Sequence, residues 1–549
     1  LALSLRPRPL VLPPPDDGSV PGVIHIHTTR SDGRGTPDEI AAAASRVGLK
    51  FLVFTDHGDG TRPPDAPVYR SGVLCLDGVE ISTSGGHYLA IGMSVAPYPL
   101  AGSPRDVVED VKRLGGVGIV AHPDSPKPEL AWRDWGVPID GMEWVNLDTS
   151  WRRPLAYGGF RGRIGLIGSL LAYPLRPEAT IAGMTGGAGD LYQWEAIARK
   201  RRLALVSGAD AHANVELTAS DPRQNRWALS LPSYESTFRA LSLHLRIPRP
   251  FSGDAVADAH LVVEALRAGH AFTAIDGLAT PASFVFTASN ELGTVHEGDE
   301  LGVGGPVTLD VRSNAPSTFS TTIYRGREPL VRSMGSQAHA TVDGDPGVYW
   351  VEIKTEGGPR DASRRWIVSN AIYVRANHAD PTVSTPADVN ASMDLLDAGG
   401  GLAWHGEHDA ASSAEVSRGE LPDARLKYGL GGGAPAGQFA ALVIDTPTGL
   451  APYERLAFAI RGDRVGRVSV QMRNAAGGAQ ALRWQRSVAV EPFERERVLS
   501  LDDFEAVGRE ATSRVNPAEV RSLLFVIDTV NTRPGTAGAL TLSKVRLER

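Results

Sequence analysis

Histidines at the ends of short apolar segments are the feature that most limits what this chain can fold into. The chain has 14 histidines. The six that precede residue 220 each lie at or beside the end of a strand-like run: His25, His27, His57, His87, His122 and His212. Three carboxylates lie in the same region: Asp32, Glu80 and Asp210. If these side chains act together, the fold must gather the ends of several strands that lie far apart in the sequence.

The segments around these histidines alternate between strand-like and helical patterns. Short apolar runs such as 23–27 and 204–207 are separated by stretches with helix signals. Residues 36–39 and 103–106 each have the composition of a capping box with proline at the first helical position, and a later helix is expected to end at Gly269. The alternation predicts β/α units around a buried parallel sheet. In a β/α barrel the carboxyl ends of the strands converge on one face, where such side chains could meet.

Changes in composition along the chain predict four regions. Residues 1–21 hold six prolines and are expected to form an extended leader. Residues 22–278 carry the alternating pattern, and short strands with Gly, Pro, Asn and Asp turns predict an immunoglobulin-like sandwich over residues 279–378. A polar stretch from His378 to about Asn390 precedes the last region, residues 385–549, which resembles a jelly-roll of the carbohydrate-binding type.

Composition and charge weigh against several classes of protein. The net charge of −7 comes without a basic run of five or more residues, so nucleic acid is not favoured as a partner. The single cysteine, Cys75, excludes disulfides within the chain and thiolate-rich metal sites, and its apolar neighbours predict burial. No apolar stretch approaches the roughly 20 residues that span a bilayer.

The amino-terminal sequence bears on location. Residues 1–5 are mostly apolar and precede Arg6-Pro7-Arg8-Pro9, which could be the remnant of a trimmed signal or anchor. With the appended β domains, this favours a periplasmic or secreted protein, while a cytoplasmic one remains open.

The spacing of the motifs indicates metal binding. Side chains alternate along a strand, so His25 and His27 would project to the same face and could hold one ion, and Asp210 and His212 repeat that spacing. Imidazole suits zinc, iron and manganese, and carboxylates supply charge and can bridge two ions. A mixed set of this size therefore predicts a hydrolytic site with more than one ion.

In their order along the chain, these motifs resemble the PHP (polymerase and histidinol phosphatase) family of metallohydrolases. The order is H-x-H, S-D-G, T-D-H, Glu, His, A-H-P and D-x-H, and it covers about residues 22 to 275. The motifs at 55–59 and 121–125, with the appended β domains, are similar to the carbaryl-hydrolase-like branch. The resemblance implies an α/β fold: a distorted seven-stranded β/α barrel, followed here by two all-β domains, the immunoglobulin-like sandwich and the jelly-roll.

The resemblance also implies three divalent ions (Mn, Zn or Fe) and a set of ligands for each. One ion would be held by His25, His27, Glu80 and Asp210. Glu80 would bridge to a second ion held by His87 and His122. The third would be held by Asp32, His57 and His212. A metal-bound hydroxide would then attack the substrate, with Glu80 and Asp210 as the catalytic carboxylates.

Weaker candidates lie nearby. Lys127 follows a ligand candidate and could meet a phosphate or a leaving group. Four arginines could clamp a phosphate from a loop over the metal face, although solvated surface positions are the alternative: Arg152, Arg153, Arg161 and Arg163. Asp56 is expected to orient a histidine rather than to bind metal.

These observations lead to one preferred function and two alternatives. The preferred one is a metal-dependent phosphoesterase that acts on a small organic phosphate. A carbamate or amide hydrolase could use the same site. The alternative of another class is a non-catalytic adhesion or glycan-binding protein, with the glycan on the carboxy-terminal domain.

Overall fold

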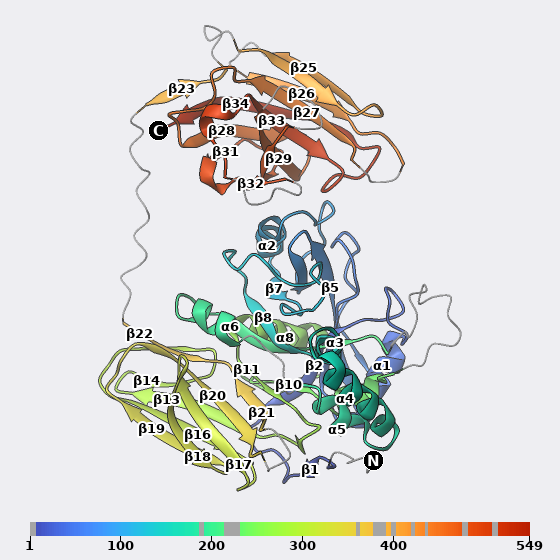
Figure 1. Ribbon diagram of the computed structural model, residues 1–549, viewed down its shortest axis with the longest axis vertical. Coiled ribbons are helices and arrows are strands. Elements are labelled where there is room, and N and C mark those ends of the chain that lie inside the picture. The colour runs from blue at the N-terminus through green and yellow to red at the C-terminus, as the bar shows by residue number, and fades with distance from the viewer. Residues whose placement is uncertain are drawn as a thin grey trace. The chain divides into compact units, whose positions relative to one another are not determined.

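The computed structural model describes ten stretches of the 549-residue chain (Figure 1). They are residues 7–185, 191–213, 231–357, 363–376, 391–396, 402–418, 423–433, 437–474, 481–507 and 514–549. The chain divides into two compact units. Unit 1 comprises Leu1–Val95 and Ser103–Asp380, and unit 2 comprises Ala96–Gly102 and Pro381–Arg549. The predicted polar stretch at 378–390 lies outside the described residues, and the finer domain limits remain predictions.

Seven strands of unit 1 close into a barrel. In order they are β2 (Val20–Ile26), β3 (Phe51–Phe54), β5 (Val73–Thr83), β6 (Gly86–Ile91), β7 (Val117–Val120), β8 (Gly141–Asn146) and β9 (Ala204–Ala211). Each strand pairs with the next, and β9 pairs with β2, which closes the ring. Neighbours run parallel except at β6, which is antiparallel to both β5 and β7.

Eight α-helices lie in the described part of unit 1. They are α1 (Pro37–Val47), α2 (Pro104–Arg113), α3 (Leu147–Tyr157), α4 (Gly159–Ala172), α5 (Pro177–Ala182), α6 (Leu191–Ala198), α7 (Tyr234–Phe238) and α8 (Ala255–Ala268), with a 3₁₀ turn at Tyr173–Leu175. The two predicted capping boxes, at Thr36 and Ser103, are confirmed, and α8 ends at Gly269 in the left-handed conformation, as expected. No helix in the described part of the chain is both long and apolar enough to cross a membrane.

The predicted fold class, α/β with a β/α barrel, is wrong. Strands hold 42% of the residues and helices 18%, so the chain is mostly β. Residues 55–72, 84–85 and 121–140 are all described, and they place no helix between β3 and β5, β5 and β6, or β7 and β8. Instead, a tight turn at Ser84-Gly85 returns the chain into antiparallel β6. Apolar runs look alike in parallel and antiparallel strands, so periodicity could not reveal this hairpin.

The barrel sheet continues into the β-rich second half of unit 1. Strands β10 (Ser242–Leu245) and β11 (Ala271–Ala274) extend it from β2, and β11 pairs with β21 (Arg364–Ser369). The other strands of this half are β12 (Ala279–Thr280), β13 (Phe284–Asn290), β14 (Gly293–His296), β15 (Glu300–Gly302), β16 (Val307–Ser313), β17 (Phe319–Arg325), β18 (Glu328–Met334), β19 (Gln337–Val342), β20 (Gly347–Thr355) and β22 (Ile372–Arg375).

The remaining features of unit 1 are two short strands, β1 (Leu10–Val11) and β4 (Val68–Arg70), and the single cysteine. Within the leader, β1 is a short strand that pairs with β12. Short β4 pairs with β5. Cys75 is buried, as expected, and burial raises the pKa of its thiol to about 12.

Unit 2 consists of two six-stranded sheets that share one apolar core. The first sheet holds β23 (Ser392–Asp394), β25 (Ser413–Arg418), β26 (Asp423–Gly429), β28 (Arg455–Gly462), β31 (Arg495–Ser500) and β34 (Ala537–Glu548). The second holds β24 (Trp404–His408), β27 (Phe439–Asp445), β29 (Gly466–Arg473), β30 (Arg483–Val490), β32 (Glu505–Ala506) and β33 (Ser522–Asp528). Side chains from both sheets, including Leu442, Phe458 and Phe525, fill the space between them.

Candidate metal centre

All nine predicted ligand candidates lie together at one end of the barrel. They form four overlapping groups whose ligand atoms lie within 4.8 Å of one another: His27, Asp32, His57 and His212; His25, His27 and Asp210; His25, Glu80 and His122; and His57, Glu80 and His87. The candidates on β2, β3, β7 and β9 lie at or just beyond the carboxyl ends of their strands. His87 lies near the amino end of β6, and because β6 is antiparallel, that end meets the same rim.

Five imidazoles surround the buried carboxylate of Glu80. Its Oε1 atom lies 2.7 Å from Nδ1 of His87 and 2.9 Å from Nε2 of His122. Its Oε2 atom lies within 3.3 Å of ring nitrogens of three others: His25, His27 and His57. Burial opposes the negative charge, but these imidazoles outweigh it and hold the pKa of Glu80 well below its usual value. Glu80 is therefore a carboxylate whose two oxygens face different sets of histidines.

Two further carboxylates flank this cluster. Asp210 Oδ1 lies 3.4 Å from Nε2 of both His25 and His27, and 3.5 Å from Nδ1 of His212. Asp32 Oδ2 lies 3.3 Å from Nε2 of His212. Burial opposes both negative charges, yet the neighbouring histidines lower the pKa of each carboxyl group. Both are therefore anionic at neutral pH.

The carboxylates act in turn on the histidines. Burial opposes a positive charge on His122, but its hydrogen bond to Glu80 raises its pKa to about 9. His212 is affected in the same way by Asp32 and Asp210, which raise its pKa to about 10. The pKa of His25 is also raised well above its usual value, against the effect of burial, by Asp210, Glu143 and Glu80. Without a cation, these imidazoles hold a proton at neutral pH.

Three of the nine candidates adopt a backbone conformation that residues other than glycine rarely take. The φ angles are 63° at His25, 29° at His122 and 48° at Asp210. Ile24 and Ile26 pair with consecutive residues of β3, so His25 bulges out of the ladder. The rings of His25 and His27 do come together, with centroids 5.2 Å apart, but the bulge means that β2 is not the regularly alternating strand that was expected. Such conformations cost about 1–3 kcal/mol each and are concentrated at functional sites.

The donor set fits divalent cations. Nε2 of His25 and Nε2 of His27 are buried and have no hydrogen-bond partner within the described residues. Buried polar atoms are rarely left in this state. Both nitrogens face the carboxylates of Glu80 and Asp210, an arrangement that suits zinc, manganese or iron.

Glu143 on β8 belongs to the site and was missed in the sequence. Its Oε1 lies 2.6 Å from Nδ1 of His25, and its Oε2 accepts hydrogen bonds from the backbone of His122 and the side chain of Asn146. A carboxylate bonded to one ring nitrogen of a histidine directs the other toward a metal. The sequence did contain a signal for Glu143, because it is a single acidic residue inside an apolar strand. A buried carboxylate must be paired with a hydrogen-bond donor or a positive charge.

Asp56 has a different role from the predicted one. It accepts hydrogen bonds from the backbone and the hydroxyl of Thr28 and from the hydroxyl of Ser31, at 2.6–2.8 Å. It therefore holds the loop that carries Asp32, and it reaches a histidine only through Ser31, whose hydroxyl lies 3.4 Å from Nδ1 of His27. Gly33 is needed in this loop, because a Cβ atom there would overlap the carbonyl of His27.

The weaker substrate-binding candidates are less closely tied to the centre. Lys127 is exposed. Arg152 bonds to Asp148 at 2.5 Å, and Arg153 bonds to Asp124. The positive charges of both arginines are thus already matched by acids, and their contact with substrate remains a prediction.

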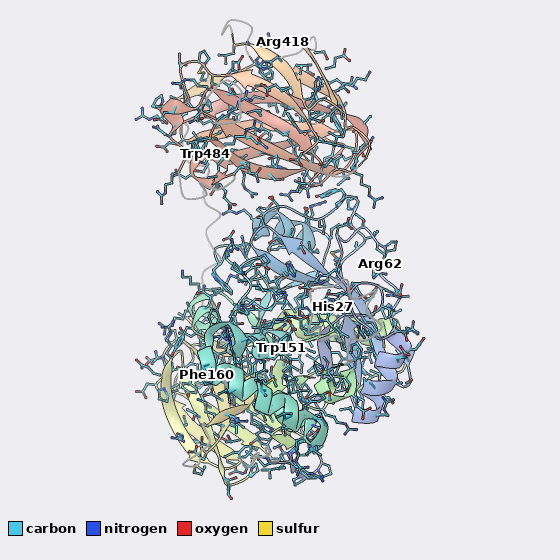
Figure 2. The ribbon with its side chains drawn as sticks, turned by 45° about the vertical axis from the view of Figure 1, so that its right-hand side comes forward. His27, Arg62, Trp151, Phe160, Arg418 and Trp484 are labelled. Atoms are coloured by element: carbon cyan, nitrogen blue, oxygen red, sulfur yellow. The ribbon has the colours of Figure 1, made fainter. Side chains whose placement is uncertain are left out.

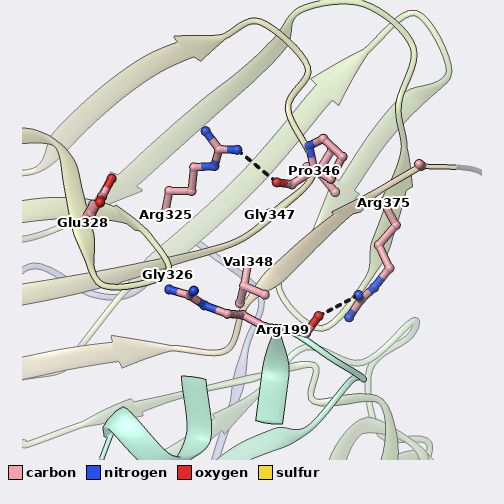
Figure 3. Close-up of a pocket in the computed structure, with 10 residues that line it drawn as sticks. Arg199, Arg325, Gly326, Glu328, Pro346, Gly347, Val348 and Arg375 are labelled. Atoms are coloured by element: carbon pink, nitrogen blue, oxygen red, sulfur yellow. Dashed lines mark hydrogen bonds between the residues drawn. The ribbon is translucent and has the colours of Figure 1, made fainter. Parts of the chain in front are cut away.

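A pocket of about 550 Å³ lies elsewhere in unit 1, and none of the nine candidates lines it. Arg325 donates to the carbonyl of Pro346, and Arg375 donates to the carbonyl of Arg199 (Figure 3). Three arginines line the pocket, and each of them pairs with a carboxylate. The pairs are Arg199–Glu195, Arg325–Asp345 and Arg375–Glu300. This pocket is not a second phosphate-binding candidate.

No family model matches the chain. An uncharacterized protein of Methanocaldococcus jannaschii is 28% identical over 137 residues, which cover 22% of this chain and 80% of that protein. A 3′,5′-nucleoside bisphosphate phosphatase of Chromobacterium violaceum is 33% identical over 92 residues, which cover 16% of this chain and 32% of that enzyme. The chain thus matches about a third of the phosphatase's length.

Solved structures with some likeness to the chain include carbohydrate-binding modules. A family 11 module of a cellulosomal cellulase of Clostridium thermocellum has a TM-score of 0.23 and 13% identity, covering 29% of this chain and 94% of that one. A family 30 module from the same organism has a TM-score of 0.19 and 13% identity, covering 25% and 81%. Likenesses at this level carry no argument about ligands.

Proposed function

We propose that the chain is a metal-dependent hydrolase of the PHP type, acting as a phosphoesterase on a small organic phosphate. One observation carries the proposal: five imidazoles enclose the buried carboxylate of Glu80, and Nε2 of His25 and Nε2 of His27 have no hydrogen bond among the described residues. Buried charges and buried nitrogen atoms without hydrogen bonds are costly unless they are paired, and bound cations would pair with them.

Three divalent cations are proposed, held by the nine candidates. His25, His27 and Asp210 would hold the first, and the two oxygens of Glu80 would join it to a second at His87 and His122. Asp32, His57 and His212 would hold the third. Two of the four groups agree with this division: one joins His25, His27 and Asp210, and another contains Asp32, His57 and His212. The other two cross it, because Glu80 groups with His25 and His122 in one and with His57 and His87 in the other.

Cations bound there would acidify a water molecule and neutralise charge on the substrate's oxygens. The chain's own residues set the geometry. Glu143 fixes the ring of His25 so that Nε2 faces the cluster, and Asp56 anchors the loop that presents Asp32. Glu80, buried among histidines, remains charged.

The substrate class has two candidates. The similarity over 92 residues to a nucleoside bisphosphate phosphatase favours a phosphate ester. A carbamate or amide is the second candidate, because Arg152 and Arg153 are neutralised by acids and so are poorly placed to attract a phosphate. The layout of residues 55–59 and 121–125 also resembles the carbaryl-hydrolase-like branch.

The test is a substrate screen with the purified full chain, chelated and then reloaded with Mn²⁺ or Zn²⁺. It would offer 4-nitrophenyl phosphate, bis(4-nitrophenyl) phosphate, 1-naphthyl N-methylcarbamate and 4-nitroacetanilide. We expect phosphate ester hydrolysis only with metal, its loss in Glu80→Gln, and wild-type rates in Glu264→Gln, an exposed acid on α8. Hydrolysis of the carbamate alone would establish the second candidate. No hydrolysis of any substrate by the loaded chain would favour the non-catalytic, glycan-binding alternative.

A further inference from the structure

Helix α4 presents its apolar side chains to solvent instead of to the core. Phe160 is 80% exposed, Ile164 52%, Ile167 57% and Leu171 61%. Their spacing of four, three and four residues places them on one face of the helix. Among the residues of α4 whose burial is described, only the last, Ala172, is buried. Most surface helices show the reverse arrangement, with the apolar face against the protein.

The apolar surface extends beyond α4. Leu155 and Tyr157 at the end of α3 are 40% and 70% exposed, and Leu175 beyond α4 is 63% exposed. We call residues 151–176 the α3–α4 segment; Figure 2 labels Trp151 and Phe160 on it. The four apolar residues on the face of α4, together with Leu155, Tyr157 and Leu175, each keep 40% or more of their surface exposed. A contiguous apolar patch of this kind marks an interaction surface.

The sequence of α4 also implies that the helix needs an apolar surrounding. It contains four glycines, at positions 159, 162, 165 and 168, and each weakens a helix interior by about 1 kcal/mol relative to alanine. Most helical stability in proteins comes from packing of an apolar face. Because α4 packs so little of its surface within the described protein, a partner that buries the stripe would stabilise it.

Charge identifies the kind of partner. The α3–α4 segment contains no acidic residue, although the whole chain carries −7, and it has five arginines: Arg152, Arg153, Arg161, Arg163 and Arg176. The first two pair with Asp148 and Asp124 outside the segment, so the charge argument does not rest on them. Arg163 is exposed and has no carboxylate partner in the described part of the chain. In a symmetric dimer this surface would face its own copy and bring arginine toward arginine. Anionic lipid headgroups would complement it.

We propose that the α3–α4 segment docks onto the surface of a bilayer that contains anionic lipids. Its apolar stripe enters the interface, and Arg163 meets the headgroups. Helix α4 has 14 residues and spans about 21 Å, so it lies in the interface rather than across the membrane. Tyr157 and Trp151 are residue types that favour this depth.

The segment is connected to the metal centre. Asn146 caps α3 by accepting from the backbone of Thr149 at 3.0 Å, and its amide donates to Glu143 at 2.9 Å. Glu143 in turn bonds His25. The docking segment is therefore joined through α3 to residues of the metal centre, and a lipid surface would concentrate an amphiphilic substrate near the protein.

Co-sedimentation of the full chain with vesicles tests the proposal. We expect the chain to pellet with phosphatidylcholine vesicles that contain phosphatidylglycerol, and to bind pure phosphatidylcholine less well. The double substitution Ile164→Glu/Ile167→Glu should lower partitioning more than about tenfold, because each isoleucine loses its apolar burial. Arg163→Gln should lower it about fivefold, and added salt should also weaken binding.

The matched control is Val256→Glu/Leu292→Glu, which changes two isolated exposed residues of unit 1 that are 66% and 61% exposed. It should bind like wild type. Equal partitioning of the Ile164/Ile167 variant, or absence of wild-type binding, would overturn the proposal. A wild-type dimer seen by sedimentation velocity without lipid, and dissociated by the same variant, would assign the surface to a second copy instead.

A second measurement guards against misfolding of the variant. Phe160→Cys, labelled with a polarity-sensitive fluorophore, should shift to the blue on anionic vesicles, whereas labelled Leu292→Cys should not. Native Cys75 is buried and should stay unlabelled. No shift at position 160 would contradict insertion.

Discussion

At the level of single residues, two buried glutamates contact the histidines of the candidate metal centre in different ways. Glu80 faces five imidazoles and is proposed to join two cations, whereas Glu143 touches His25 from the opposite side of its ring. The first would be a ligand and the second a positioning residue. Their substitutions should therefore differ in kind.

Glu143→Gln should weaken metal binding or activity by about 10–100-fold, because an amide orients the His25 ring less strongly than a carboxylate does. Competition with a chromogenic chelator measures the affinity. Glu80→Gln should lower the rate by about 100-fold or more, since it removes the charge proposed to hold two cations. Equal affinities for wild type and Glu143→Gln would show that Glu143 is only structural.

Cation binding should release protons near neutral pH. The pKa of His122 is about 9 and that of His212 about 10 in the cation-free protein, so both are protonated at pH 7 and must lose that proton to become ligands. About two protons should be released from this pair at pH 7, and affinity should rise as pH increases toward 10. Calorimetry in buffers of different ionisation enthalpy counts them, and an affinity independent of pH would argue against ligation by these residues.

The order of the motifs allowed the nine candidates to be predicted because each stands beside an apolar run that became a strand end. Glu143 has no motif of its own, and only its burial shows its importance. The bulge at His25 was equally hidden, since a left-handed φ at a histidine follows from tertiary packing rather than from local preference.

At the scale of elements, the loop after β2 carries Asp32 and is held in place by Asp56. The third proposed ion depends on this loop, because Asp32 bonds His212 and lies near His57. The loop is anchored to Asp56 through Thr28 and Ser31, and these bonds do not involve the Asp32 carboxylate. The third site should therefore be separable from the other two.

Asp32→Ala should lower the metal content by about one ion per chain while the pair at Glu80 persists, because it removes an anionic ligand from one site alone. The rate should fall more than the thermal midpoint does. Elemental analysis of wild type and variant, each loaded with excess Mn²⁺ and desalted, provides the test. Unchanged metal content together with an unchanged rate would mean that Asp32 is structural.

Helix starts were predictable because a capping box is a local pattern of a few residues, as at Thr36 and Ser103. The direction of β6 could not be predicted from the sequence. Strand direction depends on which neighbours pair, and the only local sign was the short Ser84-Gly85 turn. The same hairpin brings His87 to the rim beside the other ligand candidates, so the error concerned the fold class.

At the scale of the whole molecule, the barrel of unit 1 is not independent of the strands that follow it. β11 pairs with β21, and the side chain of Asn370 bonds to the backbone of Leu205 on barrel strand β9. These are long-range contacts that no periodicity in the sequence reveals. A chain cut near residue 278, the predicted end of the catalytic part, would therefore lose these contacts.

A fragment of residues 1–376 should fold and keep the metal-dependent activity of the whole chain, whereas a fragment of residues 1–276 should not fold stably. The shorter one loses β21 and the Asn370 hydrogen bonds, which leaves the edge of β11 unpaired and buried polar groups on β9 unsatisfied. Circular dichroism melting and metal content compare the two. A stable, metal-binding 1–276 fragment would show that the later strands contribute little.

The central claim is that the Glu80 cluster catalyses hydrolysis with bound cations. The most direct test is the rate of phosphate ester hydrolysis by the chelated full chain as Mn²⁺ is returned stepwise, with bound metal measured in the same samples. We expect no hydrolysis without metal, and we expect the rate to recover as Mn²⁺ binds at Glu80 and the histidines around it. In Glu80→Gln the rate should not recover. Full activity in the metal-free chain, or recovery in Glu80→Gln equal to wild type, would contradict the central claim.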